Sequence, residues 1–109
     1  MGINSLNANT TGDINIAIGA LALVANTTGT QNCAIGYAAL TANTTAGYNV
    51  AMGVNALSNC TTGASNTGLG TAALGALTTG NINTAVGQGA LSANTTGFRN
   101  QGFGTNSLL

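Results

Sequence analysis

Hydrophobic positions along the chain recur every 17 residues, a longer period than that of a helix or an isolated strand. Leucine occupies one such column at seven consecutive positions: Leu6, Leu23, Leu40, Leu57, Leu74, Leu91 and Leu108. Glycine stands four residues before each leucine: Gly2, Gly19, Gly36, Gly53, Gly70, Gly87 and Gly104. The residue before each glycine is always apolar, as at Ile18 and Ile35. Residues 1–109 are therefore predicted to form a single repeat domain of 17-residue units.

Polar residues keep the same period. Asparagine fills one column: Asn15, Asn32, Asn49, Asn66, Asn83 and Asn100. Two adjacent columns hold threonine, as in Thr27-Thr28 and Thr44-Thr45. The unit reads Asn-x-small-apolar-Gly-x-x-small-Leu-x-x-Asn-Thr-Thr-Gly-x-x and needs no insertion or deletion from one end of the chain to the other.

A unit of this length and composition predicts an all-β parallel β-solenoid, or β-roll, of about six coils. Helical repeats need about 33 residues for two helices, and Asn, Thr and Gly are poor residues for helix interiors. Seventeen residues suit two or three short strands with tight turns. Successive coils pair at about 4.7–4.9 Å, so six coils give a rod on the order of 30 Å long.

The columns predict which side chains lie inside the coil. We expect two core ladders, one of leucines and one of the apolar residues before glycine: Leu23, Leu40, Leu57, Leu74, Leu91, Ile18 and Ile35. The glycine column is expected at a corner with positive φ. The Asn15–Asn100 column is expected to form a turn ladder, because Asn tolerates the left-handed region and its amide can bond along a stack. Of the two small-residue columns, through Ala34 and Ala39, at least one is expected to face another chain or layer.

Charge excludes several function classes. The chain has one Asp, one Arg and no His, and only 2% of its residues are charged, where globular proteins average about 25%. General acid–base catalysis, a His- or carboxylate-built metal site and phosphate-driven nucleic-acid binding all need more such groups. We therefore expect no enzyme activity, no cofactor and no metal. The longest nearly apolar run, residues 16–25, is shorter than a membrane span of about 20 residues.

Two further motifs carry chemistry. Asn-x-Thr sequons, candidate glycosylation sites, begin at Asn9, Asn26, Asn43, Asn59 and Asn94. A sequon needs only a three-residue match, so we favour the interpretation of the same triplets as structural turns. Cys33 and Cys60 are too few for a disulfide framework, and we expect free thiols.

The segment Asn32-Cys33-Ala34-Ile35-Gly36-Tyr37-Ala38-Ala39-Leu40-Thr41-Ala42-Asn43-Thr44-Thr45 resembles the NTAIG/NTTG repeats of phage and bacterial tail-fibre-like proteins. It is similar, more distantly, to head repeats of trimeric autotransporter adhesins, whose unit is shorter. The resemblance covers the whole chain. It implies a parallel β-roll, often trimeric, on a cell or virion surface.

These observations predict a structural subunit of an extracellular or virion-surface fibre that assembles through stacked β-coils. The chain opens and stops inside a unit without polar caps, so we expect copies to stack end to end, with Asp13 of one chain paired to Arg99 of the next. An adhesin head that binds a glycan or another host-surface ligand is one alternative. An ice-binding solenoid is the second, although adjacent threonines of a strand point to opposite faces.

Overall fold

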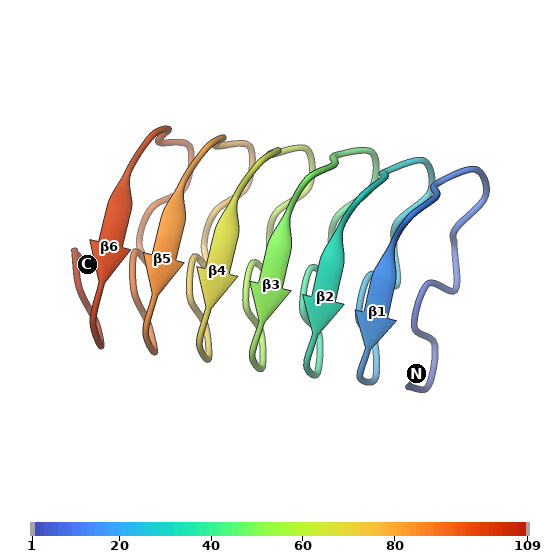
Figure 1. Ribbon diagram of the computed structural model, residues 1–109, viewed down its shortest axis with the longest axis horizontal. Coiled ribbons are helices and arrows are strands. Elements are labelled where there is room, and N and C mark those ends of the chain that lie inside the picture. The colour runs from blue at the N-terminus through green and yellow to red at the C-terminus, as the bar shows by residue number, and fades with distance from the viewer. Residues whose placement is uncertain (1, 109) are drawn as a thin grey trace.

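One short strand forms in every 17-residue unit of the computed structural model, which describes residues 2–108 (Figure 1). The strands are β1 (Ile16–Ile18), β2 (Cys33–Ile35), β3 (Val50–Met52), β4 (Thr67–Leu69), β5 (Thr84–Val86) and β6 (Gln101–Phe103). They form one parallel sheet in chain order, and each pairing joins residues 17 apart, such as Ala34 with Ala51. The predicted parallel β-solenoid of 17-residue coils is confirmed.

Each coil holds one strand of three residues, not the two or three strands expected. Left-handed backbone recurs at three non-glycine columns, with φ of 64° at Leu21, 51° at Leu23 and 56° at Gln31. Such residues end an extended segment, so the rest of each coil consists of turns. The turns still bond to neighbouring coils: the Leu23 N–H donates to the Ala39 carbonyl at 3.1 Å.

The glycine column forms the corner at which each strand ends, as expected. Gly36 has a φ of 134°, and a Cβ built there would lie 2.6 Å from the carbonyl oxygen of Gly53 in the next coil. Both the backbone conformation and the close approach of two coils therefore require glycine.

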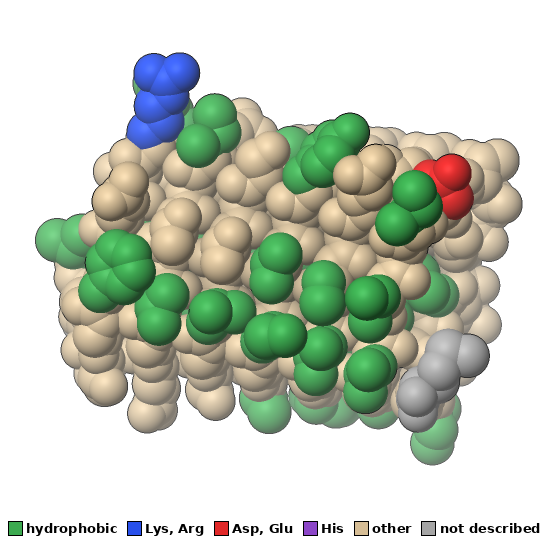
Figure 2. Space-filling view, in the orientation of Figure 1, with side chains coloured by type: hydrophobic (Ala, Val, Ile, Leu, Met, Phe, Trp, Pro, Cys, Tyr) green, Lys and Arg blue, Asp and Glu red, His purple; other side chains and the backbone are tan. Residues whose placement is uncertain are grey.

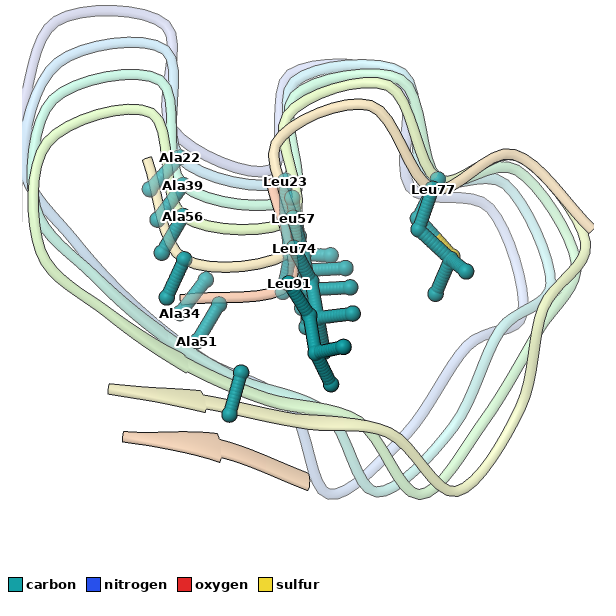
Figure 3. Packing of buried hydrophobic residues seen from close by; sticks show 14 of the residues in the cluster. Ala22, Leu23, Ala34, Ala39, Ala51, Ala56, Leu57, Leu74, Leu77 and Leu91 are labelled. Atoms are coloured by element: carbon teal, nitrogen blue, oxygen red, sulfur yellow. The ribbon is translucent and has the colours of Figure 1, made fainter. Parts of the chain in front are cut away.

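The core is a stack of leucine and alanine side chains that runs the length of the solenoid (Figure 3). Leu23, Leu40, Leu57 and Leu74 are fully buried, and Leu91 is 4% exposed. Figure 3 shows the leucines superposed in one column, with Ala22, Ala39 and Ala56 beside them and Ala34 and Ala51 across the interior. Leu77 lies apart from this column in a second lobe of the coil.

The strand side chains point the opposite way from the sequence-based expectation. Ile18 is 48% exposed and Ile35 is only half-buried, so neither belongs to a core ladder. The alanine before each of them, Ala17 or Ala34, is buried instead. Neighbouring residues of a strand face opposite sides of the sheet, and the interior opposite the leucines holds only small side chains.

Both small-residue columns lie inside the coil of their own chain, so the expectation that one of them faces another chain or layer was wrong. Ala34, Ala51 and Ala85 are fully buried, and so are Ala39 and Ala56. The interior is narrow even where the column has glycine. A Cβ built at Gly68 would lie 3.1 Å from the Ala73 carbonyl oxygen and 3.5 Å from Leu57 Cδ1.

We expect Leu57→Ala to lower the free energy of unfolding by about 2–5 kcal/mol, because it opens a cavity in a core with no room to collapse. Thr41→Ala is the control, since Thr41 is half-buried in a column that also holds Asn, Val, Ser and Gly, and changes outside the core cost within about 0.5 kcal/mol. Urea unfolding followed by circular dichroism measures both. Equal losses at the two positions would contradict the core assignment.

Candidate functional site

Asparagines of the Asn15–Asn100 column tie each coil to the next. The Asn49 backbone N–H donates to Asn32 Oδ1 at 3.0 Å, and Asn49 Nδ2 donates to the Gly63 carbonyl oxygen of the following coil at 2.8 Å. The same two bonds recur along the column. The four middle members are buried: Asn32, Asn49, Asn66 and Asn83. The column is thus an internal polar ladder whose amides are satisfied by neighbouring coils.

The turn itself is made by the residue before each of these asparagines. Gln31, Tyr48 and Ser65 have φ between 56° and 62°, whereas the asparagines that follow them do not have positive φ. The expected bonding of amides along the stack is therefore present, but the left-handed conformation falls one residue earlier. Sequence pattern could not locate it, because that column contains Ile, Gln, Tyr, Ser and Arg.

A second asparagine ladder starts in the Asn-Thr-Thr triplets and then stops. Asn26 Nδ2 donates to Asn9 Oδ1 at 2.9 Å, and Asn43 Nδ2 donates to Asn26 Oδ1 at 2.8 Å. The next two members of the column are Cys60 and Leu77, which carry no amide. Asn43 Oδ1, on the near side of this gap, is consequently buried without a hydrogen-bond partner. On the far side, the Nδ2 of the next asparagine, residue 94, is unpaired in the same way.

This ladder overturns glycosylation at two of the five sequons. Asn26 and Asn43 are fully buried, and their Nδ2 atoms donate to the ladder and to the carbonyls of Gly29 and Ala46. A glycan on either nitrogen is incompatible with this packing. Asn9 and Asn94 are half-buried. Asn59, in a different column, is exposed and stays a candidate site.

The two threonine columns have different roles. Thr27 Oγ1 donates to the carbonyl of Thr44 in the next coil at 3.1 Å, a bond repeated in neighbouring coils. The second column is exposed throughout: Thr11, Thr28, Thr45, Thr62, Thr79 and Thr96. Only one of the two columns thus presents free hydroxyls to solvent.

Cys33 and Cys60 are free thiols, as expected, in different environments. Cys33 is half-buried on the outer side of β2. Cys60 is fully buried, and its Sγ donates to the Gly63 carbonyl at 3.3 Å. Burial raises the pKa of the Cys60 thiol to about 11, against a smaller lowering by that hydrogen bond.

The outer face of the sheet is apolar, and its polarity changes along the axis (Figure 2). Alternate strand residues project outward, and Ile16, Ile18, Met52 and Phe103 are between 41% and 64% exposed. The column that begins with Ile16 continues as Cys33, Val50, Thr67, Thr84 and Gln101. The column after glycine also changes from apolar to polar residues along the axis, through Tyr37, Val54, Thr71, Gln88 and Thr105. The apolar face is therefore broad over β1–β3 and narrows over β4–β6 to a single stripe.

The two charged side chains lie far apart. Asp13, just before β1, and Arg99, just before β6, are both exposed. Figure 2 shows the acidic and the basic side chain at opposite ends of the upper edge. Whether they pair between chains stays a prediction.

Residues 2–108 contain no group of three or more His, Cys, Asp or Glu side chains that could hold a metal ion. That part of the chain also has no helix long and apolar enough to cross a membrane. Comparison with protein-family models, curated proteins and solved structures finds no match.

Completing the second asparagine ladder should stabilise the protein cooperatively. Cys60→Asn alone satisfies Asn43 Oδ1 but places a new amide oxygen against Leu77, and Leu77→Asn alone leaves the gap at Cys60. In the double variant each amide meets its neighbour. We expect a favourable coupling energy of about 1–3 kcal/mol, measured by a double-mutant cycle in urea. If the changes in the free energy of unfolding are additive, the two amides do not bond to each other and the ladder is contradicted.

The raised pKa of Cys60 makes stability depend on alkaline pH. The unfolded thiol ionises near its ordinary value of 9.0, whereas the folded thiol ionises near 11. The contribution of this group is fully present below pH 9 and is lost as the pH rises to 11. Wild-type stability should fall across that window by more than that of Cys60→Ala, as measured by urea unfolding at each pH. Identical pH profiles would contradict this.

Proposed function

We propose that the chain is a shaft segment of an extracellular fibre, on a cell or virion surface, with a structural and not a catalytic role. The observation that carries this proposal is the register: all five strand pairings join the same columns with a shift of 17 residues. Such a stack extends by adding coils without changing any contact. A rod of defined length, built from one repeated unit, is what a fibre shaft requires.

End-to-end assembly uses the contacts that already join the coils. Each coil donates hydrogen bonds to both of its neighbours at fixed columns. The Leu40 N–H donates to the Ala56 carbonyl of the following coil at 3.0 Å, and the Gly36 N–H donates to the Ile18 carbonyl of the preceding coil at 2.7 Å. A coil edge can therefore receive any coil that carries the same columns, including one from a second copy. In such a stack Asp13 of one chain lies within about one or two coils of Arg99 of another, and we retain this as the end-to-end pair.

Lateral assembly uses the apolar sheet face, with further copies of the same chain as its partners. The molecule measures 35 Å by 22 Å in the plane of this face, so the face can bury at most about 800 Å² per partner, the size of a standard stable interface. Parallel chains in register place the broad apolar region of one over that of the other. Antiparallel chains would cover it with Thr67, Thr84 and Gln101. The resemblance to trimeric β-roll proteins supports a parallel bundle, with three chains as the expected number.

Light scattering and negative-stain electron microscopy test this proposal. The 10.5 kDa chain should form oligomers that extend into uniform filaments. Met52→Glu introduces a charge at the centre of the sheet face, on a side chain that is 41% exposed, and should release monomers with an unchanged circular dichroism spectrum. Thr45→Glu, on the exposed threonine column, is the matched control and should assemble like the wild type. A wild-type protein that stays monomeric at every concentration would overturn the fibre assignment.

Two alternatives predict other outcomes. An adhesin head predicts discrete oligomers without filaments, together with binding to a glycan array or to extracellular matrix. The ice-binding hypothesis is favoured by one observation, the exposed threonine column that includes Thr45 and Thr62. It predicts thermal hysteresis that Thr45→Glu abolishes. The bonded hydroxyls of the adjacent column, Thr27 and Thr44 among them, leave a single free threonine row, and for this reason we rank ice binding below the fibre.

A further inference from the structure

The edge of the solenoid that precedes the strands combines two features that proteins usually avoid. Ile14, Tyr48 and Ile82 are 73%, 59% and 51% exposed. The same three residues have left-handed backbone, with φ of 55°, 62° and 59°. Asn, Asp or Gly would relieve both the strain and the exposure at such a turn. Large apolar side chains at these positions therefore point to a contact outside the chain.

These side chains occur at every second coil. The column that holds them continues as Ile14, Gln31, Tyr48, Ser65, Ile82 and Arg99. Coils 1, 3 and 5, numbered by their strands, carry a large apolar residue, whereas coils 2, 4 and 6 carry a polar one. The edge is thus a row of apolar knobs about 9–10 Å apart, twice the coil spacing, with polar gaps between them. Tyr48 stands beside the smallest side chains of the edge, those of Gly47, Ala64 and Ser65.

The two ends of this edge carry opposite charges. Asp13 adjoins the knob of coil 1, and Arg99 occupies the gap of coil 6. Phe98, which is 65% exposed, adds an apolar group beside Arg99. Figure 2 shows the acidic and the basic side chain at the two ends of the row, with apolar groups between them.

We propose that this edge, the columns of Asp13–Phe98 and Ile14–Arg99, binds the same edge of a second copy in antiparallel orientation. A twofold axis between coils 3 and 4 sets coil 1 against coil 6, coil 2 against coil 5 and coil 3 against coil 4. Every knob then meets a gap: Ile14 faces Arg99 of the other copy, Ile82 faces Gln31, and Tyr48 faces Ser65. The alkyl stems of Arg99 and Gln31 pack on the isoleucines.

Electrostatics selects the same orientation. The twofold arrangement brings Asp13 close to Arg99 of the other copy twice. A parallel arrangement in register sets Asp13 against Asp13 and Arg99 against Arg99, where like charges oppose association, and sets knob against knob. The contact uses neither the sheet face nor the backbone edges of the terminal coils, and it pairs Asp13 and Arg99 across the edge in place of the end-to-end pair. It therefore goes beyond the fibre proposed above and needs only two copies of the chain.

The edge is narrow, and a contact of this size belongs to the transient class below about 1,200 Å². Covalent capture therefore suits it better than equilibrium mass measurement. Gln31 and Ile82 are the best positions for cysteines, because they lie three coils apart in one chain and face each other in the proposed pair. Cys33→Ser removes the half-buried thiol, and the buried Cys60, with its raised pKa, stays in place.

In the experiment, Gln31→Cys and isotope-labelled Ile82→Cys proteins are mixed under mild oxidation, and the disulfide-linked dimers are counted by mass spectrometry. The proposal predicts that mixed 31–82 dimers greatly exceed the statistical one half. Thr28→Cys mixed with Thr79→Cys is the matched control, since these exposed residues belong to the same two coils on another column. It should give no such excess.

Charge reversal supplies a second readout. Arg99→Asp should lower the yield of mixed dimers at low salt by at least about twofold, and Asp13→Arg added to it should restore the yield. Dominant 31–31 and 82–82 dimers would establish a parallel contact and overturn the proposal, and a statistical mixture would overturn it as well. Neither result depends on the sheet face, which Met52→Glu tests. Failure of the edge contact is therefore distinguishable from failure of the proposed fibre.

Discussion

The whole structure depends on pairing between identical columns of successive coils. A three-residue strand is too short to be stable by itself, and a single coil encloses almost no interior. Only the repetition of the same backbone bonds, asparagine bonds and leucine contacts from coil to coil makes the fold cooperative, as in other solenoids. This requirement explains why the period stays at 17 residues: one inserted residue would shift every later column, moving Leu57 or Asn49 out of its ladder.

The ladders also explain how the backbone tolerates so much left-handed conformation. Leucine rarely adopts positive φ, yet Leu23, Leu40, Leu57, Leu74 and Leu91 all have φ near 50°. Burial of each side chain and the hydrogen bonds of its turn offset the strain. At Ile14, Tyr48 and Ile82 the backbone is similar but the side chain is exposed, so within one chain the strain is not offset by burial.

Sequence alone predicted the repeat, the solenoid, the leucine core and the glycine corner, because each is a column with one residue type and one physical reason. Prediction from the sequence failed where the space inside the coil, and not the polarity of the residues, decides which column is buried. The Ile18 column is apolar throughout yet faces outward, because the interior opposite Leu23 accepts only a methyl group. Asn26 and Asn43 looked like turn residues or sequons, because burial of an amide depends on a partner in the next coil. Sequence pattern gave no signal for the turn at Gln31 and Tyr48, since that column has no preferred residue type.

The sheet face and the edge before the strands are two surfaces that take no part in the ladders. They differ in the feature that sets the direction of a second chain packed against them. The sheet face changes from Ile16 to Gln101 along the axis, so its asymmetry lies in polarity. The edge before the strands alternates between knob and gap and has opposite charges at its ends. The first kind of asymmetry favours chains that run in the same direction, the second favours chains that run in opposite directions.

The direction of the hydrogen bonds has a mechanical consequence. In this solenoid the bonds between coils run along the long axis, whereas in most sheets pulled end to end they lie across the load. Tension on the rod therefore opens one coil at a time, beginning at an end, and does not require many bonds to break together. Each coil that opens replaces a rise of about 5 Å by an extended segment of 17 residues, a gain of about 50–55 Å. A rod of this construction yields in equal steps under load and lengthens roughly tenfold before its chain is taut.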